Sequence, residues 1–174
     1  MVKKVFMLST IVCFLMALEI GTIPKRVILE KDKGGKIDGS VFDTASIKGK
    51  VYLIIYSDPD KRNLNEPFFE KVKAKNFDRN RYVSIAIINM AATWIPNFLL
   101  NAILKTKQKK YPYTIYVKDN KKVLVHAWHL PDNDQVVIIF DQNGRVRYIE
   151  HGKLSQQEQE RALHILEELI NESH

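Results

Sequence analysis

Residues 136–149, VVIIFDQNGRVRYI, decide the fold of this chain. Residues 136–140 are apolar without alternation, which is typical of a strand that is covered on both faces. Residues 141–144 (DQNG) predict a hairpin turn, with Gly144 at the position that requires a positive φ. Residues 146–149 are then the returning strand, so the C-terminal part of the chain contains a β-hairpin.

A helix is predicted directly after the hairpin. Ser155 and Glu158 have the spacing of a capping box, in which each side chain bonds the backbone N–H of the other residue. Beyond this start, apolar residues recur at helical spacing and trace one face: Ala162, Ile165, Leu166, Leu169 and Ile170. The sequence therefore predicts an amphipathic closing helix.

Upstream of the hairpin, strands and helices alternate. The predicted strands are residues 51–56, 83–88 and 113–117, and the predicted helices are residues 66–76 and 96–106. Residues 33–35 predict a polar turn, and the pattern of residues 121–130 suits a helix or a strand. This order predicts an α/β protein with a thioredoxin-like fold, in which helices flank a mixed central sheet and the hairpin and last helix close the domain.

The N-terminus has the pattern of a secretion signal. Lys3 and Lys4 precede an apolar run of 14 residues, which Glu19 ends. A membrane-spanning helix needs about 20 such residues, so we interpret residues 1–20 as a signal peptide and residues 21–174 as the domain. We therefore expect a periplasmic protein. An uncleaved N-terminal anchor is the alternative, because no clean small-x-small cleavage triplet is present.

Cysteine content excludes one class of function. Cys13 is the only cysteine of the chain, and it lies inside the predicted signal segment. The mature domain would then contain no thiol. Disulfide exchange requires attack by a thiolate, so a thiol-disulfide oxidoreductase is excluded.

The chain is basic, with a net charge of +7. The densest cluster is Lys105, Lys107, Lys109 and Lys110, which we interpret as a solvated helix end, where cations suit the helix dipole. No nucleic-acid motif accompanies these lysines, so we expect no nucleic-acid partner. Contact with a membrane is expected only through the signal segment during export.

Several short motifs, in this order and spacing, resemble the YtfJ family of exported Gram-negative bacterial proteins, within the thioredoxin-like superfamily. They are Lys48-Gly49-Lys50-Val51, Arg81-Tyr82, Ile88-Asn89, Tyr111-Pro112, Ala127-Trp128 and residues 144–158. The resemblance implies a periplasmic thioredoxin-like domain and assigns no biochemical activity.

The superfamily also implies where a redox site would lie. Its cysteine pair would stand in the loop after the first core strand, residues 58–65, and its cis-proline at about Gln135. Neither residue type is present there, and a non-proline cis bond is costly, so the bond before Gln135 is predicted to be trans. Both loops are expected at one edge of the sheet, where ligands usually bind. The predicted binding surface is Asp58, Asp60, Arg62, Asn133, Asp134 and Gln135, with Trp94 at its margin.

Other interpretations of these residues remain open. The Asp58-Pro59-Asp60 loop is also typical of a turn that caps the next helix. His126 and His129 share a face only if residues 121–130 are helical, and no third metal ligand is evident from the spacing. We therefore expect no metal and no cofactor. Trp128, among apolar neighbours, is predicted to be core.

Two function classes follow. The first is a non-catalytic binding or interaction module, whose partner is an unknown periplasmic protein or small ligand. The alternative is a metal-dependent or hydrolytic enzyme that uses the Asp58/Asp60 loop or the His126/His129 pair. The absence of any recognisable catalytic motif favours the first class.

Overall fold

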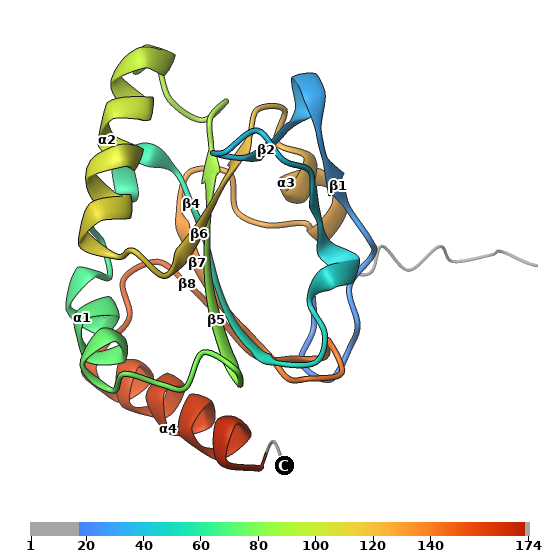
Figure 1. The fold of residues 1–174 in the computed structure, drawn as a ribbon, viewed down its shortest axis with the longest axis vertical. Helices are drawn as coiled ribbons and strands as arrows, with labels where there is room; N and C mark the ends of the chain where they lie inside the picture. Colours follow the sequence, from blue (N-terminus) through green and yellow to red (C-terminus); the bar gives the residue numbers. More distant parts are fainter. Residues whose placement is uncertain (1–17, 173–174) are drawn as a thin grey trace, which may run out of the picture.

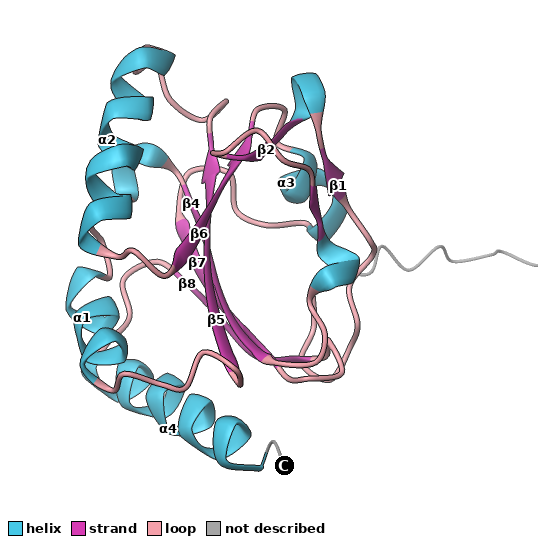
Figure 2. Ribbon diagram, in the orientation of Figure 1, coloured by secondary structure: helices cyan, strands magenta, loops and turns pink. Residues whose placement is uncertain are grey.

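A six-stranded mixed sheet forms the centre of the computed structural model, which describes residues 18–172 (Figures 1 and 2). Its strand order is β2-β6-β5-β4-β7-β8, and β1 pairs with β3 in a separate two-stranded sheet. The strands are β1 (Ile28–Leu29), β2 (Gly34–Lys36), β3 (Phe42–Asp43), β4 (Val51–Ser57), β5 (Tyr82–Asn89), β6 (Thr114–Asp119), β7 (Gln135–Phe140) and β8 (Val146–His151).

Helices cover both faces of this sheet. The α-helices are α1 (Glu66–Ala74), α2 (Asn97–Lys110), α3 (Val123–Trp128) and α4 (Gln156–Glu172), and short 3-10 turns are Lys31–Lys33, Thr44–Ser46 and Pro59–Lys61. Figure 1 shows α1, α2 and α4 on one face and α3 with β1 on the other. Strands β4, β5 and β6 are mutually parallel, whereas β7 runs antiparallel to β4 and to β8. The predicted mixed sheet is confirmed.

The local features of the C-terminal third are confirmed. Gly144 has φ 76°, and a Cβ built there would lie 2.8 Å from the carbonyl oxygen of Ile47. In the capping box, the Ser155 N–H donates to Glu158 Oε2 at 2.6 Å, and the Glu158 N–H donates to Ser155 Oγ at 3.2 Å. The positive φ of Gly144 and the two bonds of the capping box are local features, which explains why the sequence predicted them, whereas the contact of Gly144 with Ile47 is not local.

The prediction of a turn at residues 33–35 is wrong for its glycines. Gly34 and Gly35 belong to β2, which pairs antiparallel with β6 at the edge of the sheet. Gly34 has φ 128°, and a Cβ there would collide with the carbonyl oxygen of Lys118. These glycines therefore allow a close approach of two backbones, which a local pattern does not reveal.

The open question about residues 121–130 is settled, because residues 123–128 form helix α3. Trp128 in this helix is 2% exposed, and its indole N–H donates to the carbonyl oxygen of Lys25 at 2.8 Å. Its ring packs against Phe140 at a centroid separation of 6.1 Å. Trp128 is therefore a core residue, as predicted.

Two predictions concern the N-terminal segment of the chain. Cys13 and most of the predicted signal segment lie outside the described residues. Within residues 18–172, no helix has both the length and the apolar character that crossing a bilayer requires.

Candidate functional site

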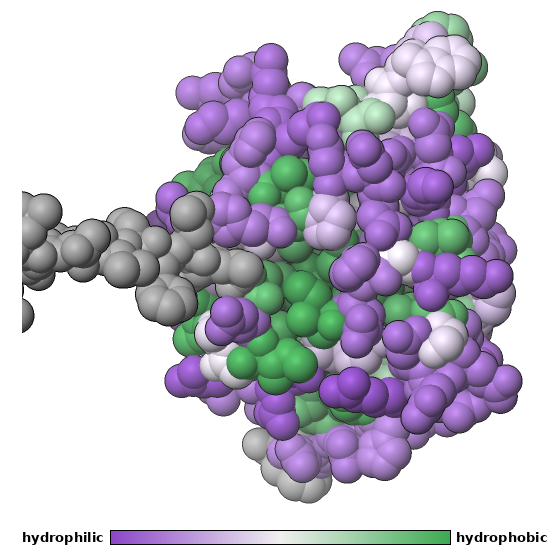
Figure 3. All heavy atoms as spheres, turned by 180° about the vertical axis from the view of Figure 1, so that it is seen from behind, coloured by the Kyte–Doolittle hydropathy of each residue, from purple (hydrophilic) through white to green (hydrophobic). Residues whose placement is uncertain are grey.

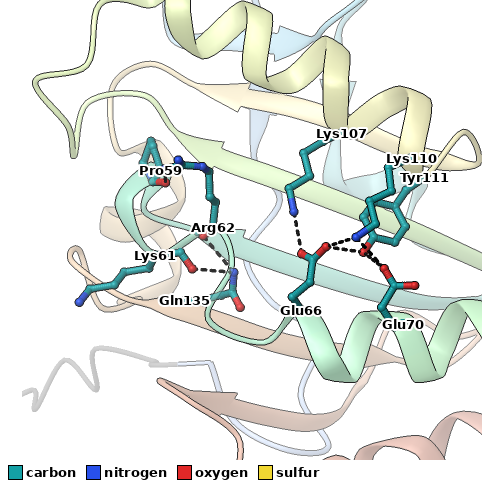
Figure 4. A network of polar contacts seen from close by, with 10 residues as sticks. Pro59, Lys61, Arg62, Glu66, Glu70, Lys107, Lys110, Tyr111 and Gln135 are labelled. Atoms are coloured by element: carbon teal, nitrogen blue, oxygen red, sulfur yellow. Dashed lines mark hydrogen bonds and ion pairs between the residues drawn. The ribbon is translucent and has the colours of Figure 1, made fainter.

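The two loops expected to meet at one sheet edge are in direct contact. The N–H of Asp58 donates to the carbonyl oxygen of Asp134 at 3.0 Å. Ser57 and Gln135 face each other in the β4–β7 register, and Gln135 Nε2 donates to Ser57 Oγ at 3.1 Å. The same nitrogen donates to the carbonyl oxygen of Lys61 at 3.3 Å, as Figure 4 shows. The peptide bond before Gln135 is trans.

Gln135 was expected on a polar binding surface, but it is the first residue of β7 and only 1% exposed, so it is buried. The Lys61 carbonyl can only accept, which fixes the amide with Nε2 toward Lys61. Gln135 Oε1 then has no hydrogen-bond partner in the described part of the chain. An unpaired buried acceptor of this kind costs about 1–3 kcal/mol.

The remaining candidate residues of this edge divide into structural and exposed groups. Asp58 is buried, and its Oδ1 accepts from the Asp60 N–H at 2.7 Å, so it caps the turn Pro59–Lys61. Asp134 Oδ1 accepts from the N–H of Gln135 at 2.8 Å. Asp60 and Asn133 are exposed. The predicted turn is confirmed, but Asp58 caps the 3-10 turn Pro59–Lys61 and not helix α1, whose N-cap residue is Asn65.

Arg62 lines the cavity described below, whereas Trp94 lies on the surface. The Arg62 Nη1 donates to the carbonyl oxygen of Pro59 at 2.8 Å. Trp94 is 89% exposed. Its neighbour Thr93 donates to Asp60 Oδ2 at 3.3 Å, which brings the Trp94 segment beside the loop after β4.

The His126/His129 pair is not part of a metal-binding cluster within the described residues. His126 lies within α3, but His129 is its C-cap residue with φ 53°, so it leaves the helical path. Within residues 18–172, no group of three or more His, Cys, Asp or Glu side chains is placed to hold a metal ion. The structure therefore gives the metal-dependent alternative no observation in its favour.

A cavity of about 560 Å³ lies between helices α1 and α2 and the sheet face of β4, β5 and β6. Its walls are mainly apolar, and Ser57, Arg62 and Gln135 line it as well. Representative apolar wall residues are Leu53, Ile55, Phe69, Ala86, Ile88 and Ile103. The cavity therefore extends from the edge where the fold would hold its thiols into the interior.

The cavity is present because the sheet has small side chains at this place and because helix α2 packs few residues against it. Strands β5 and β6 present Ser84, Ala86 and Thr114 to the cavity. Helix α2 buries only Leu100 and Leu104 among its 14 residues. The two helices therefore stand over the sheet without filling the gap beneath them.

A polar cluster joins α1 to α2 beside this cavity (Figure 4). Glu66 of α1 accepts from Lys107 at 2.6 Å, from Lys110 at 2.5 Å and from the Tyr111 hydroxyl at 2.8 Å. The Tyr111 hydroxyl also lies 2.7 Å from Glu70 Oε1. We call these five residues the α1–α2 clip, because every bond named here links helix α1 to the end of α2.

The clip shifts the ionisation of its members. Partial burial of Glu66 raises its pKa, but the hydrogen bonds from Lys107, Lys110 and Tyr111 outweigh burial and lower the pKa to about 2. Hydrogen bonds to Glu66 and Glu70 raise the pKa of Lys110 to about 12. Burial, followed by the two carboxylates, raises the pKa of Tyr111. At neutral pH Glu66 and Lys110 are therefore charged, and Tyr111 keeps the hydroxyl proton that it donates to Glu66.

The clip corrects one interpretation of the sequence. Lys107 and Lys110 were assigned to a solvated helix end, but both are bonded to Glu66. Lys105 and Lys109 of that cluster are exposed and fit the assignment. The available signal was the i, i+3 spacing of Lys107 and Lys110, which places both on one helix face. Their acidic partners lie some 40 residues earlier, so the sequence alone did not pair them.

Comparison with solved structures identifies the fold. A putative thiol:disulfide interchange protein DsbE from Chlorobium tepidum superimposes with a TM-score of 0.63 at 14% identity, covering 88% of this chain and 99% of that chain. A peroxiredoxin-like protein from Aquifex aeolicus has a TM-score of 0.61 at 12% identity, covering 88% of this chain and 89% of that chain. At these identities the likeness establishes the thioredoxin-like fold and does not extend to activity.

Sequence relatives identify the family. The uncharacterised protein YtfJ of Escherichia coli (strain K12) is 24% identical over 148 residues, covering 83% of this chain and 78% of its own. An uncharacterised protein of Haemophilus influenzae is 29% identical over 116 residues, covering 64% of this chain and 62% of its own. The family model described as "Bacterial protein of unknown function (YtfJ_HI0045)" matches residues 26–169. With its thioredoxin-like fold and no cysteine in the loop after β4, the chain therefore belongs to the YtfJ family.

Proposed function

We propose that this protein is an exported, non-redox binding module of the periplasm, which holds a small, largely apolar ligand in the cavity under α1 and α2. The observation that carries the proposal is the free acceptor of Gln135, buried at the place of the cis-proline and lining that cavity. Natural proteins pair nearly all such buried oxygens. This oxygen is covered in the structure, so a ligand with an N–H or O–H donor supplies the missing bond when the Gln135 side chain turns its oxygen toward the cavity.

Export is supported by the first 20 residues and by the relatives. The basic start, the apolar run and its early end at Glu19 are features of a cleaved signal. The two sequence relatives come from Gram-negative bacteria, which have a periplasm. The absence of disulfides is compatible with that compartment, because the domain has large apolar clusters on both faces of its sheet.

A non-redox role is supported by the residues that replace the thiols. The loop after β4 is occupied by Pro59, Asp60 and Lys61 in a 3-10 turn, capped by Asp58. The chain has no cysteine after residue 13. The edge therefore supplies hydrogen-bonding groups and no nucleophilic sulfur.

The cavity sets the chemical class of the ligand. Its volume of about 560 Å³ lies in the usual range of small-molecule sites, about 300–1,000 Å³. Apolar walls favour an aromatic or aliphatic body, and Gln135 requires one donor at the end near Ser57. Arg62, at the same end, favours a ligand that also carries an acceptor.

A matched pair of probes tests the proposal. 2-Naphthol has an apolar body and one O–H donor, whereas 2-methoxynaphthalene has the same body without the donor. Binding of each is measured by fluorescence titration to the protein and to the variants Gln135→Leu and Gln156→Leu. Gln156 is an exposed glutamine at the start of α4, which makes it the control.

The donor should contribute a factor of about 5 to 150 in affinity, which corresponds to about 1–3 kcal/mol for a buried, otherwise unpaired acceptor. We expect this factor in the parent and in Gln156→Leu, and its loss in Gln135→Leu. Failure of both naphthalenes to bind would refute the cavity as a ligand site. Equal affinity of the two probes for the parent protein would refute the role of Gln135.

A further inference from the structure

The net positive charge of the chain comes from one segment. Residues 79–118 contain seven Lys or Arg residues and no Asp or Glu. The whole chain has 27 basic and 20 acidic residues, so the rest of the chain is balanced, with 20 of each. The segment corresponds to β5, α2 and β6, and α2 is its solvent-facing helix (Figure 1).

Helix α2 has two differently charged sides. Lys107 and Lys110 point to α1, where Glu66 and Glu70 neutralise them. Lys105 and Lys109 are exposed, and neither forms an ion pair with a described residue. The outer face therefore retains an uncompensated positive charge at its C-terminal half.

The N-terminal half of the same outer face is apolar. Phe98, Ala102, Lys105 and Lys109 are spaced by four, three and four residues, and all four are exposed. This spacing places them on one stripe of the helix. The outer face of α2 thus changes from aromatic to basic along its length.

The aromatic end of this stripe is unusually exposed. Trp94 is 89%, Phe98 71% and Leu99 45% exposed, all within six residues of the chain. The top of α2 in Figure 1 corresponds to the upper right of Figure 3, where hydrophobic and near-neutral spheres project beyond the rest of the surface. We call Trp94, Phe98 and Leu99 the α2 tip. Clusters of this kind on a water-soluble surface usually mark a site of contact.

We propose that the α2 tip docks the protein on an anionic membrane surface. Tryptophan and phenylalanine favour the headgroup boundary of a bilayer, and neighbouring lysines are attracted to anionic headgroups. Lys105 and Lys109 lie about 10 and 16 Å from Phe98 along the helix axis. The Lys105 side chain reaches the headgroup layer when the tip is inserted.

The shape and charge of this surface favour lipid over a protein partner. The tip projects outward as a convex point, and a fluid bilayer surface accepts such a shape without a preformed pocket. The 40 residues of the segment 79–118 contain no acidic side chain that would be repelled by anionic lipid. Next to the tip, the carboxylate of Asp60 accepts a hydrogen bond from Thr93. This inference is independent of the cavity, and it extends membrane contact beyond the signal segment to the folded domain.

The experiment uses a chain of residues 18–174, because residues 18–172 contain both apolar clusters and every strand of the fold. It is mixed with vesicles of phosphatidylcholine alone or with about one third phosphatidylglycerol. The readouts are co-sedimentation and tryptophan emission. Of the two tryptophans, only Trp94 is exposed, so a blue shift on binding reports insertion of the tip.

Four double variants separate the contribution of the tip from that of the charge. Trp94→Phe with Phe98→Ser retains one aromatic ring, whereas Trp94→Ser with Phe98→Ser removes both, and the latter should weaken binding at least about tenfold. Lys105→Gln with Lys109→Gln should weaken binding to anionic vesicles about thirtyfold at low salt, and should leave binding to phosphatidylcholine unchanged. Lys121→Gln with Lys153→Gln, two exposed lysines outside the segment, is the matched control.

The expected result is preferential binding of the parent to anionic vesicles with a blue-shifted emission, and loss of co-sedimentation in the tip variant Trp94→Ser with Phe98→Ser. Three results would overturn the proposal: no co-sedimentation with anionic vesicles, binding without a change in emission, or equal binding by the tip variant. Capture of a specific protein through the tip in place of vesicle binding would reassign this surface to a protein interface.

Discussion

Replacing Glu66 by glutamine removes the carboxylate on which the α1–α2 clip is centred. Glu66 accepts from Lys107, Lys110 and Tyr111, and its side chain is 24% exposed. Glutamine has nearly the same shape but no charge, so the variant leaves Lys107 with a neutral partner. Because the clip links α1 to α2 over the cavity, the substitution loosens the roof of the candidate site.

The shifted pKa sets the size and the sign of the effect. The pKa of Glu66 is about 2 in the folded protein, against an ordinary value of 4.5. At 1.36 kcal/mol per pKa unit, the charged form of Glu66 contributes at most about 3.4 kcal/mol to the free energy of unfolding. Solvent screening of the partly exposed pairs reduces this to roughly 1–3 kcal/mol. Since the folded pKa is the lower one, the contribution is fully present above pH 4.5 and is lost as the pH falls from 4.5 toward 2.

Urea unfolding at pH 7 and at pH 2.5 measures this contribution. Glu66→Gln should unfold about 1–3 kcal/mol more easily than the parent at pH 7, and the difference should shrink at pH 2.5. Glu167→Gln is the control, because Glu167 forms a more exposed ion pair with Lys75, which should contribute at most about 1 kcal/mol. Parallel pH profiles for the parent and Glu66→Gln would refute the clip as a stabilising unit.

Three further predictions follow from sequence and structure. The N-terminus of the protein recovered from periplasm should begin between about residues 18 and 23; N-terminal sequencing checks this, and an intact chain in the cytoplasm would contradict export. The mature protein should neither reduce insulin disulfides nor change its melting temperature with reductant, because no thiol remains after residue 13; activity above background would contradict this. Gly144→Ala should lower the free energy of unfolding by about 1–3 kcal/mol, because φ is 76° and the Ile47 carbonyl lies 2.8 Å from the added Cβ; unchanged stability in urea would contradict the strain argument.

Features that depend on neighbouring residues were predictable from the sequence. The turn at residues 141–144, the capping box of Ser155 and Glu158 and the burial of residues 136–140 are each confirmed. Their energetics act over a few residues, through a positive φ, a helix cap or an unbroken apolar run. The order of such elements was sufficient to predict the thioredoxin-like fold.

The features of the candidate site required contacts between distant parts of the chain. Gln135 belongs to a polar stretch in the sequence, yet pairing with Ser57, 78 residues away, makes it a buried residue with a free acceptor. Tyr111 and Glu66 are separated by 45 residues, and their bond joins two helices that show no sequence relation.

The sequence by itself determined the class of fold, the absence of cysteine after residue 13 and the likeness to the YtfJ family, because these depend on residue identity and local order. Only the tertiary structure decided that Asp58 is a cap, that Gln135 is buried, and that a cavity lies under α1 and α2. The physical reason is that burial and cavity volume depend on how far each helix stands from the sheet. That distance depends on small residues under the helices, such as Ala86, and on the bonds that Glu66 makes to the end of α2. Both involve contacts between residues that are far apart in the sequence.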